Sequence, residues 1–271
     1  MDRRSGLGAL MALAGGAVVP AAVRSEEAGA RRAISGAARA MLVELYTSEG
    51  CSSCPPADRW LSDVSRPSRG GSDLLVPLSL HVAYWDAIGW KDRFAQADFA
   101  IRQRWLTSIG GGRTVYTPGV FVDGREWRRW DDAADLARRT DRAARTPAAA
   151  RIELDADTRA DGPTVTARAW RRDAPAPYAR PALFVALTES GLATRVTAGE
   201  NRGETLRHDH VVRRLDGPLG FGADGFATLS VPVEAALAGA STRAVAFVQD
   251  LATGATLQAL SLALGTVRAR G

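Results

Sequence analysis

The sequence has little of the residue types that bind metal ions, with only two cysteines and three histidines among 271 residues. A structural zinc or iron–sulfur site needs more thiolate or imidazole ligands than this chain supplies. Long apolar runs are also missing, because no stretch beyond the N-terminal segment approaches the ~20 residues of a spanning helix. We therefore expect no metal centre, no bound cofactor and no membrane span after signal cleavage.

Lysine is nearly absent as well. Lys91 is the only lysine, and arginine supplies the rest of the positive charge. The net charge of +5 and the isoelectric point of about 9.8 would suit an anionic partner. The arginines are dispersed, however, and only residues 125–129 are locally dense. Because no nucleic-acid-binding motif accompanies the charge, we expect no nucleic-acid partner.

The N-terminal residues 1–30 predict a signal peptide. Arg3 and Arg4 precede an apolar segment rich in alanine and glycine at residues 7–19, and small residues follow it. Cleavage is expected between about residues 21 and 30. The paired arginines permit twin-arginine as well as general export. A membrane anchor that stays attached is the alternative. We predict a periplasmic or secreted protein, in a compartment where disulfides persist.

Both cysteines lie in one motif, Cys51-Ser52-Ser53-Cys54, between an apolar run at 42–47 that predicts a strand and a segment at 57–64 that predicts a helix. Residues three apart at a helix start have the Cα spacing of a disulfide. The positive end of the helix favours a thiolate at Cys51, and Cys54 lies one turn further in. We predict an outward-facing, attacking Cys51 and a covered, resolving Cys54. A static disulfide and half of a metal site are the alternatives.

The order of elements predicts the fold class. Residues 40–146 have the order of elements that is typical of a thioredoxin-like α/β domain. The order is a strand, Cys-x-x-Cys, a helix, a strand, a helix at 94–108, Thr117-Pro118, a hairpin at Asp123-Gly124 and a helix. In the helix at 94–108, Ile101 is among the residues predicted on the apolar face. After a linker, residues 151–267 contain roughly seven short strands, which predict an all-β antiparallel sandwich domain.

Four segments resemble a family of secreted bacterial thioredoxin-like proteins of unknown function. They are VELYTSEGCSSCPPAD at 43–58, HVAYWD with GWKD at 81–92, YTP with VDG at 116–124, and GENRG with the residues after it at 199–213. The resemblance covers about residues 41–264. It implies a thioredoxin fold, suggests thiol chemistry with a protein thiol or disulfide as substrate or redox partner, and supplies no established substrate.

Glu44 is the first candidate beside the cysteines, because thioredoxins carry a buried carboxylate in the strand that precedes their thiols. A charged residue in an apolar strand is costly to bury without a purpose or a partner. We predict that Glu44 accepts the proton of Cys54. An edge-facing or salt-bridged Glu44 is the alternative.

Thr117 and Pro118 are expected beside the disulfide, with a cis peptide bond between them, because the resemblance implies this arrangement. The backbone before such a proline can pair with a substrate chain. Tyr84 and Trp85 are predicted to form a substrate-binding lip, and the alternative is that they pack in the core.

Four further polar residues have weaker predicted roles. Asp58, four residues after Cys54, either tunes the thiols or is structural. His81 either approaches the site or packs in the core. His208 and His210 are expected to share a strand face, where they could hold a metal, although no third ligand is evident.

These observations predict an exported thiol–disulfide oxidoreductase that acts through a mixed disulfide. The alternatives are an exported binding or scaffold protein with a structural disulfide, and a periplasmic protein that handles copper(I) through its thiolates.

Overall fold

The computed structural model describes residues 23–27, 30–66, 74–159, 162–172, 178–239 and 241–265. Most of the predicted signal peptide, residues 1–22 and 28–29, lies outside the described residues. The elements in chain order are β1 (Val23–Glu27), β2 (Ala30–Ile34), β3 (Met41–Thr47), α1 (Pro55–Val64), β4 (Leu75–His81), the 3₁₀ helix η2 (Ala83–Ile88), α2 (Ala97–Ile109), β5 (Gly119–Val122), β6 (Arg125–Glu126), α3 (Ala133–Arg145), β7 (Ala150–Arg159), β8 (Gly162–Arg171), β9 (Pro181–Glu189), β10 (Leu192–Arg195), β11 (Thr205–His208), β12 (Val211–Gly220), β13 (Phe226–Pro232), the 3₁₀ helix η3 (Ala235–Leu237), β14 (Thr242–Asp250) and β15 (Thr256–Ala263).

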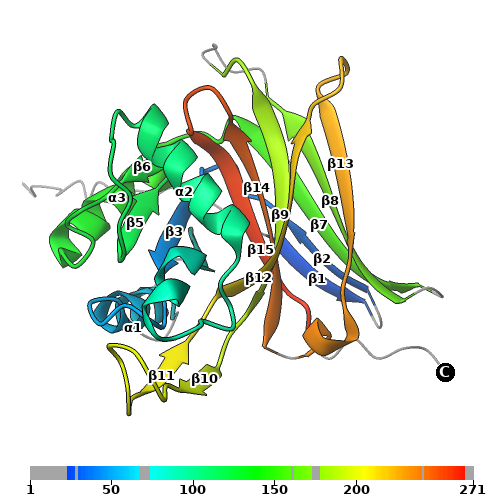
Figure 1. Ribbon diagram of the computed structural model, residues 1–271. Coiled ribbons are helices and arrows are strands. Elements are labelled where there is room, and N and C mark those ends of the chain that lie inside the picture. Colours follow the sequence, from blue (N-terminus) through cyan, green and yellow to red (C-terminus); the bar gives the residue numbers. More distant parts are fainter. Residues whose placement is uncertain are drawn as a thin grey trace, which may run out of the picture.

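The larger sheet has eight strands in the order β15-β14-β9-β12-β4-β3-β5-β6 (Figure 1). Strands β3 and β4 are parallel, and β12 meets β4 in parallel at the single pair Val211 and Ser79. The remaining pairs in this sheet are antiparallel. This narrow β12–β4 junction joins a helix-covered half of the sheet to a half made of long antiparallel strands.

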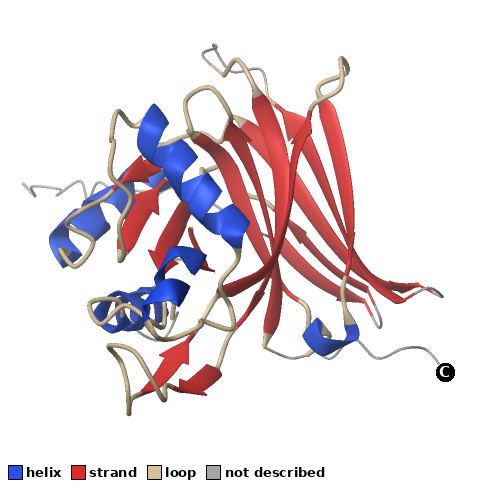
Figure 2. Cartoon of the chain, in the orientation of Figure 1, coloured by secondary structure: helices blue, strands red, loops and turns tan. Residues whose placement is uncertain are grey.

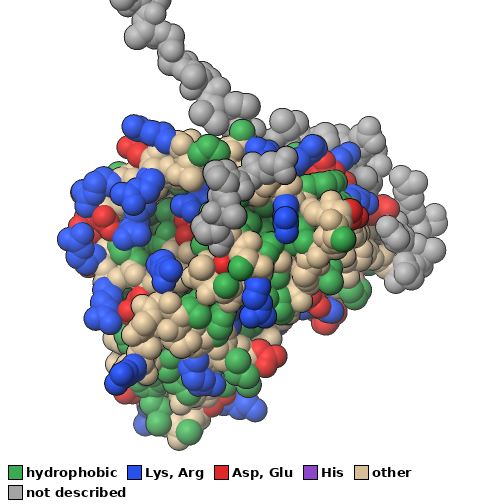
Figure 3. Space-filling view, turned by 90° about the horizontal axis from the view of Figure 1, so that it is seen from above, with side chains coloured by type: hydrophobic (Ala, Val, Ile, Leu, Met, Phe, Trp, Pro, Cys, Tyr) green, Lys and Arg blue, Asp and Glu red, His purple; other side chains and the backbone are tan. Residues whose placement is uncertain are grey.

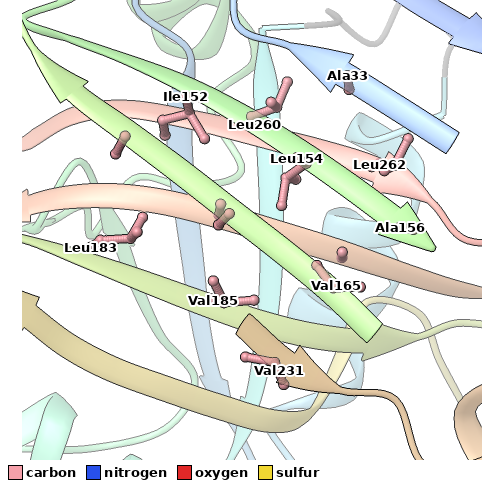
Figure 4. Packing of buried hydrophobic residues seen from close by; sticks show 14 of the residues in the cluster. Ala33, Ile152, Leu154, Ala156, Val165, Leu183, Val185, Val231, Leu260 and Leu262 are labelled. Carbon is pink, nitrogen blue, oxygen red and sulfur yellow. The ribbon is translucent and has the colours of Figure 1, made fainter. Parts of the chain in front are cut away.

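A second sheet of five antiparallel strands, β1-β2-β7-β8-β13, packs against the long strands of the first. Alternate residues of each strand point between the two sheets, as the period of two in a strand requires. Figure 4 shows the resulting core, in which residues of β7 and β8 face residues of β9 and β15. The labelled members are Ala33, Ile152, Leu154, Ala156, Val165, Leu183, Val185, Val231, Leu260 and Leu262.

The helices α1, α2, α3 and η2 gather at the other end of the larger sheet, whereas η3 follows β13 (Figure 2). Helix α2 covers one face, where Phe99 and Leu106 pack on Leu42 and Tyr46 of β3. Helices α1 and α3 cover the opposite face, where the alternate β3 residues Met41, Val43 and Leu45 are buried. Strand β3 therefore has helices on both sides, which explains why all seven of its residues are buried.

The predicted fold class is wrong. We expected an α/β thioredoxin-like domain followed by an all-β sandwich domain. The described part of the chain instead has far more strand than helix, and one mixed sheet combines β3, β4 and β5 with β9, β12, β14 and β15. The local patterns predicted strands and helices but not their partners, because pairing between strands far apart in sequence leaves no local signal.

On the face seen in Figure 3, Lys and Arg side chains are interspersed with acidic and hydrophobic ones. Among the described residues, no helix has both the length and the apolar character that crossing a membrane requires.

Candidate functional site

Cys51 and Cys54 form a disulfide at the start of α1, with their Cα atoms 5.4 Å apart. Cys54 is the N-cap residue, and its carbonyl accepts hydrogen bonds from the N–H groups of Ala57 (2.9 Å) and Asp58 (3.1 Å). Prolines occupy the first two positions of the helix and donate no hydrogen bond. The helix dipole therefore favours a negative charge here, but few free N–H groups are left to bind one.

Both cysteines are completely buried, with 0% of each residue exposed. The expectation that Cys51 faces outward is therefore wrong. The Ser53 hydroxyl lies 3.3 Å from Cys51 Sγ and can donate to it, because a disulfide sulfur carries no proton. The carbonyl oxygen of Thr117 lies 3.8 Å from the same sulfur. Backbone and side-chain atoms thus enclose the sulfur that a substrate would have to reach.

The segment 199–202, between β10 and β11, holds the Cys-x-x-Cys loop. Asn201 Nδ2 donates to the carbonyls of Glu49 (2.8 Å) and Cys51 (3.0 Å). The Glu200 carboxylate accepts from the N–H (3.0 Å) and the hydroxyl (2.8 Å) of Ser52, and these bonds lower the Glu200 pKa. We call residues 199–202 the clasp segment, because its four hydrogen bonds tie a distant part of the chain to the disulfide.

Thr117 and Pro118 lie where they were expected. The peptide bond between them is cis, and the Thr117 carbonyl faces the disulfide. The next residue, Gly119, has no room for a side chain, since an added Cβ would lie 2.9 Å from both Gln103 Nε2 and the Tyr116 carbonyl.

Tyr84 and Trp85 lie on η2, and the structure treats them differently. Tyr84 is 37% exposed, and its hydroxyl donates to Gln103 Oε1 (3.2 Å). Gln103 in turn donates to the Tyr116 carbonyl (2.8 Å), so Tyr84 and Tyr116 are joined beside Thr117. Trp85 is partly buried and packs against the core under α2. Tyr84 therefore has exposed surface that a substrate could contact, whereas Trp85 packs against the core, which was the alternative.

Glu44 is salt-bridged, which was the alternative to a catalytic role. Arg102 of α2 binds it with two hydrogen bonds, from Nε (2.6 Å) and from Nη2 (3.0 Å). Tyr46 donates a third (3.0 Å), and Arg102 also donates to Gln249 of β14 (2.8 Å). Because side chains alternate along β3, Glu44 points to the α2 face, away from α1 and Cys54.

A buried group of two histidines and three carboxylates lies on the α1 side instead. His81 Nδ1 binds Asp92 Oδ2 (2.6 Å), and the same oxygen accepts the Glu49 N–H (2.9 Å). His208 Nε2 lies 3.2 Å from Glu49 Oε1, and His208 Nδ1 lies 4.0 Å from Asp58 Oδ2. We call these five residues the acid–histidine cluster. None of them is more than 7% exposed.

The cluster connects directly to the disulfide loop. Glu49 is two residues before Cys51, and its other carboxylate oxygen accepts from Trp90 Nε1 (2.9 Å). Asp58 accepts from the Thr47 hydroxyl (3.2 Å) at the end of β3. Strand, helix and clasp segment therefore meet around the buried charges.

Burial and the neighbouring charges shift the pKa values within the cluster in opposite directions. Burial raises the pKa of Asp58, and the positive charges of His208 and His81 offset only part of this. Burial also opposes ionisation of Glu49, Asp92 and His81. The histidines nevertheless lower the pKa of Glu49 and Asp92, and the Asp92 bond and charge raise that of His81. Asp58 is therefore the carboxylate of the cluster that binds a proton most readily.

His208 and His210 do not share a strand face. Strand β11 ends at His208, and His210 occupies a turn with φ of 58° and binds Ser65 Oγ (2.7 Å). Among the described residues, no group of three or more His, Cys, Asp or Glu side chains has an arrangement that could hold a metal ion.

Residues of the site that were not identified from the sequence include Glu49, Asp92, Glu200 and Asn201. Each lies inside a motif that was recognised, and Glu49 and Asp92 adjoin buried segments. A charged residue next to apolar strands and aromatic residues is expected to be buried and to bind a partner of opposite charge or a hydrogen-bond donor. The partner of each residue, however, could not be read from the sequence.

The sequence matches a family model over most of its length. The family model described as "Protein of unknown function (DUF1223)" matches residues 42–249, which include the disulfide and the clasp segment. No curated protein matches the sequence.

Two solved structures resemble the chain in fold. A crystal structure of a protein from Agrobacterium tumefaciens has a TM-score of 0.56 and 24% sequence identity, and the match covers 86% of this chain and 98% of that one. HBP35 of Porphyromonas gingivalis has a TM-score of 0.59 and 15% identity, with 84% and 76% covered. The match to the A. tumefaciens protein spans nearly its whole length. The two chains therefore share the mostly-β architecture described above, not the thioredoxin-like fold class expected from the sequence.

Proposed function

We propose that this chain, which belongs to the DUF1223 family of proteins of unknown function, is an exported thiol–disulfide oxidoreductase that acts through Cys51 and Cys54. The disulfide's position carries the proposal: it joins residues three apart at the positive end of α1. A loop this short removes little unfolded-state entropy, about 2 kcal/mol against about 4.7 kcal/mol for a 100-residue loop. A bond with a small structural benefit, placed where a thiolate is favoured, suits reversible exchange.

The reaction follows from the position of the two sulfurs. A substrate thiolate attacks Cys51 Sγ, the bond to Cys54 breaks with its electron pair on Cys54 Sγ, and a mixed disulfide forms. A second substrate thiol then displaces Cys51, so the substrate is oxidised and the protein reduced. In the reverse direction, the Cys51 thiolate attacks a substrate disulfide and Cys54 resolves the product.

Exchange requires a local opening, because Cys51 has no exposed surface. The four hydrogen bonds of Glu200 and Asn201 hold the loop closed. At about 0.5–1.5 kcal/mol per bond, breaking the two buried Asn201 hydrogen bonds costs about 1–3 kcal/mol. The open form would then be a small but accessible fraction of the molecules.

A polypeptide thiol is the substrate class that fits the surroundings. Tyr84 and Tyr116 are 37% and 39% exposed and are joined through Gln103 beside Thr117. Exposed tyrosines offer both apolar area and a hydroxyl to a bound chain. We include Thr117, Pro118 and Tyr84 in the proposed substrate contact and leave Trp85 to the core.

The decisive experiment traps the mixed disulfide. Reduced Cys54→Ser retains the attacking Cys51 thiolate, which should displace one half of a disulfide-linked peptide and accumulate the mixed disulfide, whereas the matched variant Cys51→Ser should not. Asn201→Ala should react faster with the same peptide, because it removes two of the four bonds that close the site. Equal and negligible trapping by both cysteine variants would refute the proposal.

The second candidate is an exported binding or scaffold protein with an inert disulfide. The complete burial of both cysteines is the observation that favours it. The reduction potential separates the two: a value below about −300 mV, with no trapped partner, is typical of structural disulfides. Retention of copper(I) by the reduced wild type would favour metal handling instead.

A further inference from the structure

We infer that Asp58 is the proton donor and acceptor for the Cys54 sulfur, and that His208 connects this carboxyl group to solvent. The inference rests on the proposed thiol–disulfide exchange. It assigns to Asp58 the role that sequence alone gave to Glu44.

Cys54 and Asp58 lie one turn apart on the buried face of α1. The Asp58 N–H donates to the Cys54 carbonyl (3.1 Å), and the two residues are 0% and 7% exposed. Side chains four apart on a helix have Cβ atoms about 5–6 Å from each other. A carboxyl group at this spacing can reach the sulfur directly or through one water, which is the distance that proton transfer requires.

The Cys54 sulfur needs such a partner. When the disulfide breaks, an electron pair is left on an atom that has no contact with solvent. A buried anion is costly unless a proton or hydrogen-bond donors compensate it. The start of α1 supplies few donors, because its first two residues are prolines and the next two N–H groups bind the Cys54 carbonyl.

Asp58 differs from the other buried carboxylates in what surrounds it. Glu44 is neutralised by Arg102, and Asp92 by a short hydrogen bond to His81. Within the described part of the chain, the polar contacts of the Asp58 carboxylate are the Thr47 hydroxyl at 3.2 Å and a histidine nitrogen at 4.0 Å. Burial raises its pKa accordingly. It is therefore the carboxyl group of the site that can carry a proton and release it.

His208 provides a route to solvent. It lies between Asp58 and Glu49, and neither of its ring nitrogens has a hydrogen-bond partner among the described residues. A cavity of about 310 Å³ between α1 and β11 is lined by His208 together with Arg59, Ser62, Arg66 and Arg207, among others. A proton can pass from this cavity to the imidazole and on to Asp58.

The step balances as follows. The substrate thiolate forms a bond to Cys51 Sγ, the Cys51–Cys54 bond breaks, and Cys54 Sγ takes the electron pair and the Asp58 proton. The Asp58 carboxylate regains a proton through His208. In reverse, the Asp58 carboxylate removes the Cys54 proton, so that the thiolate can attack the mixed disulfide. The substrate is oxidised by two electrons and the protein disulfide is reduced, or the converse.

The titratable groups that face Asp58 set its pH dependence. They are His81 from β4, His208 from β11 and Asp92 from the loop after η2. Glu49, from the loop after β3, contacts His208 and Asp92 in turn. The two histidines stabilise the ionised Asp58, and Asp92 opposes ionisation.

The test is the pH profile for reduction of the protein disulfide by dithiothreitol, expressed per reductant thiolate. The wild-type rate should fall as pH rises through the Asp58 pKa, because the proton donor is lost. Asp58→Asn should be about 100-fold slower at low pH, with no such fall, since positioned acids contribute roughly 10²–10⁴-fold. Asp98→Asn, at an exposed position in the first turn of α2 and away from this cavity, is the control and should keep the wild-type profile.

A second variant keeps the inference falsifiable if Asp58→Asn folds poorly. Because the His208 charge lowers the Asp58 pKa, His208→Gln should move the fall in rate to higher pH. A merely structural role would change the rate at every pH alike. Wild-type profiles in both variants, or uniform slowing in both, would overturn the inference. Failure of Cys54→Ser to trap any mixed disulfide would instead overturn the proposed function.

Discussion

The ion pair between Glu44 and Arg102 allows a quantitative test of the structure. Arg102→Met removes the guanidinium and leaves the Glu44 carboxylate, which is 0% exposed, with only the Tyr46 hydroxyl. It also removes the donor to Gln249. Breaking a buried pair on one side costs about 3–5 kcal/mol, and the orphaned amide oxygen adds about 1 kcal/mol. We expect the free energy of unfolding to fall by about 4–6 kcal/mol, and the melting temperature by about 10–20 °C.

The double variant Arg102→Met/Glu44→Leu supplies the control. It leaves neither charge behind, and replacement of a whole buried pair by apolar side chains is often neutral. We expect its stability to return to within about 2 kcal/mol of wild type. Urea unfolding followed by circular dichroism measures all three proteins. A single variant as stable as wild type, or a double variant no more stable than Arg102→Met, would refute the reasoning.

The same pair decides whether Glu44 takes part in thiol exchange. Because Glu44 points to the α2 face, Glu44→Gln should change the rate of thiol–disulfide exchange by less than about twofold at any pH where the variant is folded. Loss of a proton-transfer group would instead slow the exchange roughly 100-fold. A loss of that size in Glu44→Gln would return the role to Glu44 and remove it from Asp58.

Three further predictions test other parts of the structure. Burial raises the pKa of Asp123 to about 6, so the folded state binds this proton more tightly than the unfolded state does. As pH rises from 4 to 7, the free energy of unfolding of wild type should therefore fall by about 2–3 kcal/mol relative to that of Asp123→Asn, measured by urea unfolding. Burial lowers the pKa of His210 to about 4, so its imidazole NMR resonance should titrate near that pH. As pH falls from 7 to 4, the free energy of unfolding of wild type should decrease by about 3 kcal/mol relative to that of His210→Asn. A titration midpoint near 6.5 would contradict this prediction. An added Cβ at Gly124 would overlap the Gly254 carbonyl oxygen, whereas Gly191 has a similar positive φ and open space around it. Gly191→Ala should lower the free energy of unfolding by about 1–2 kcal/mol, and Gly124→Ala should lower it clearly more. Equal melting temperatures for the two variants would disprove the close contact.

Elements that depend on neighbouring residues were predicted well from the sequence. The strand at 42–47, the helix after the cysteines and the Asp123-Gly124 turn are present as β3, α1 and the β5–β6 hairpin. Alternation, proline placement and turn-forming residues act over a few positions, so their signal is local. The proximity of the two thiols followed from their spacing for the same reason.

Residues whose environment depends on a distant segment were predicted poorly. Ile101 was expected on the apolar face of its helix but is 57% exposed, whereas Arg102 is buried because Glu44 and Gln249 satisfy it. A buried arginine resembles a surface residue in the sequence until its partner is known.

The sequence by itself determined that this chain carries one pair of thiols, that they lie at a helix start, and that they can close a disulfide. Only the tertiary structure decided what surrounds them. Asn201 and His208 come from a segment some 150 positions away. Asn201 holds the disulfide loop, and His208 completes the acid–histidine cluster. The physical reason is that spacing along a chain is a local property. The pairing of buried charges depends on which strands meet, and here the junction of β12 with β4 brings the two halves of the chain together.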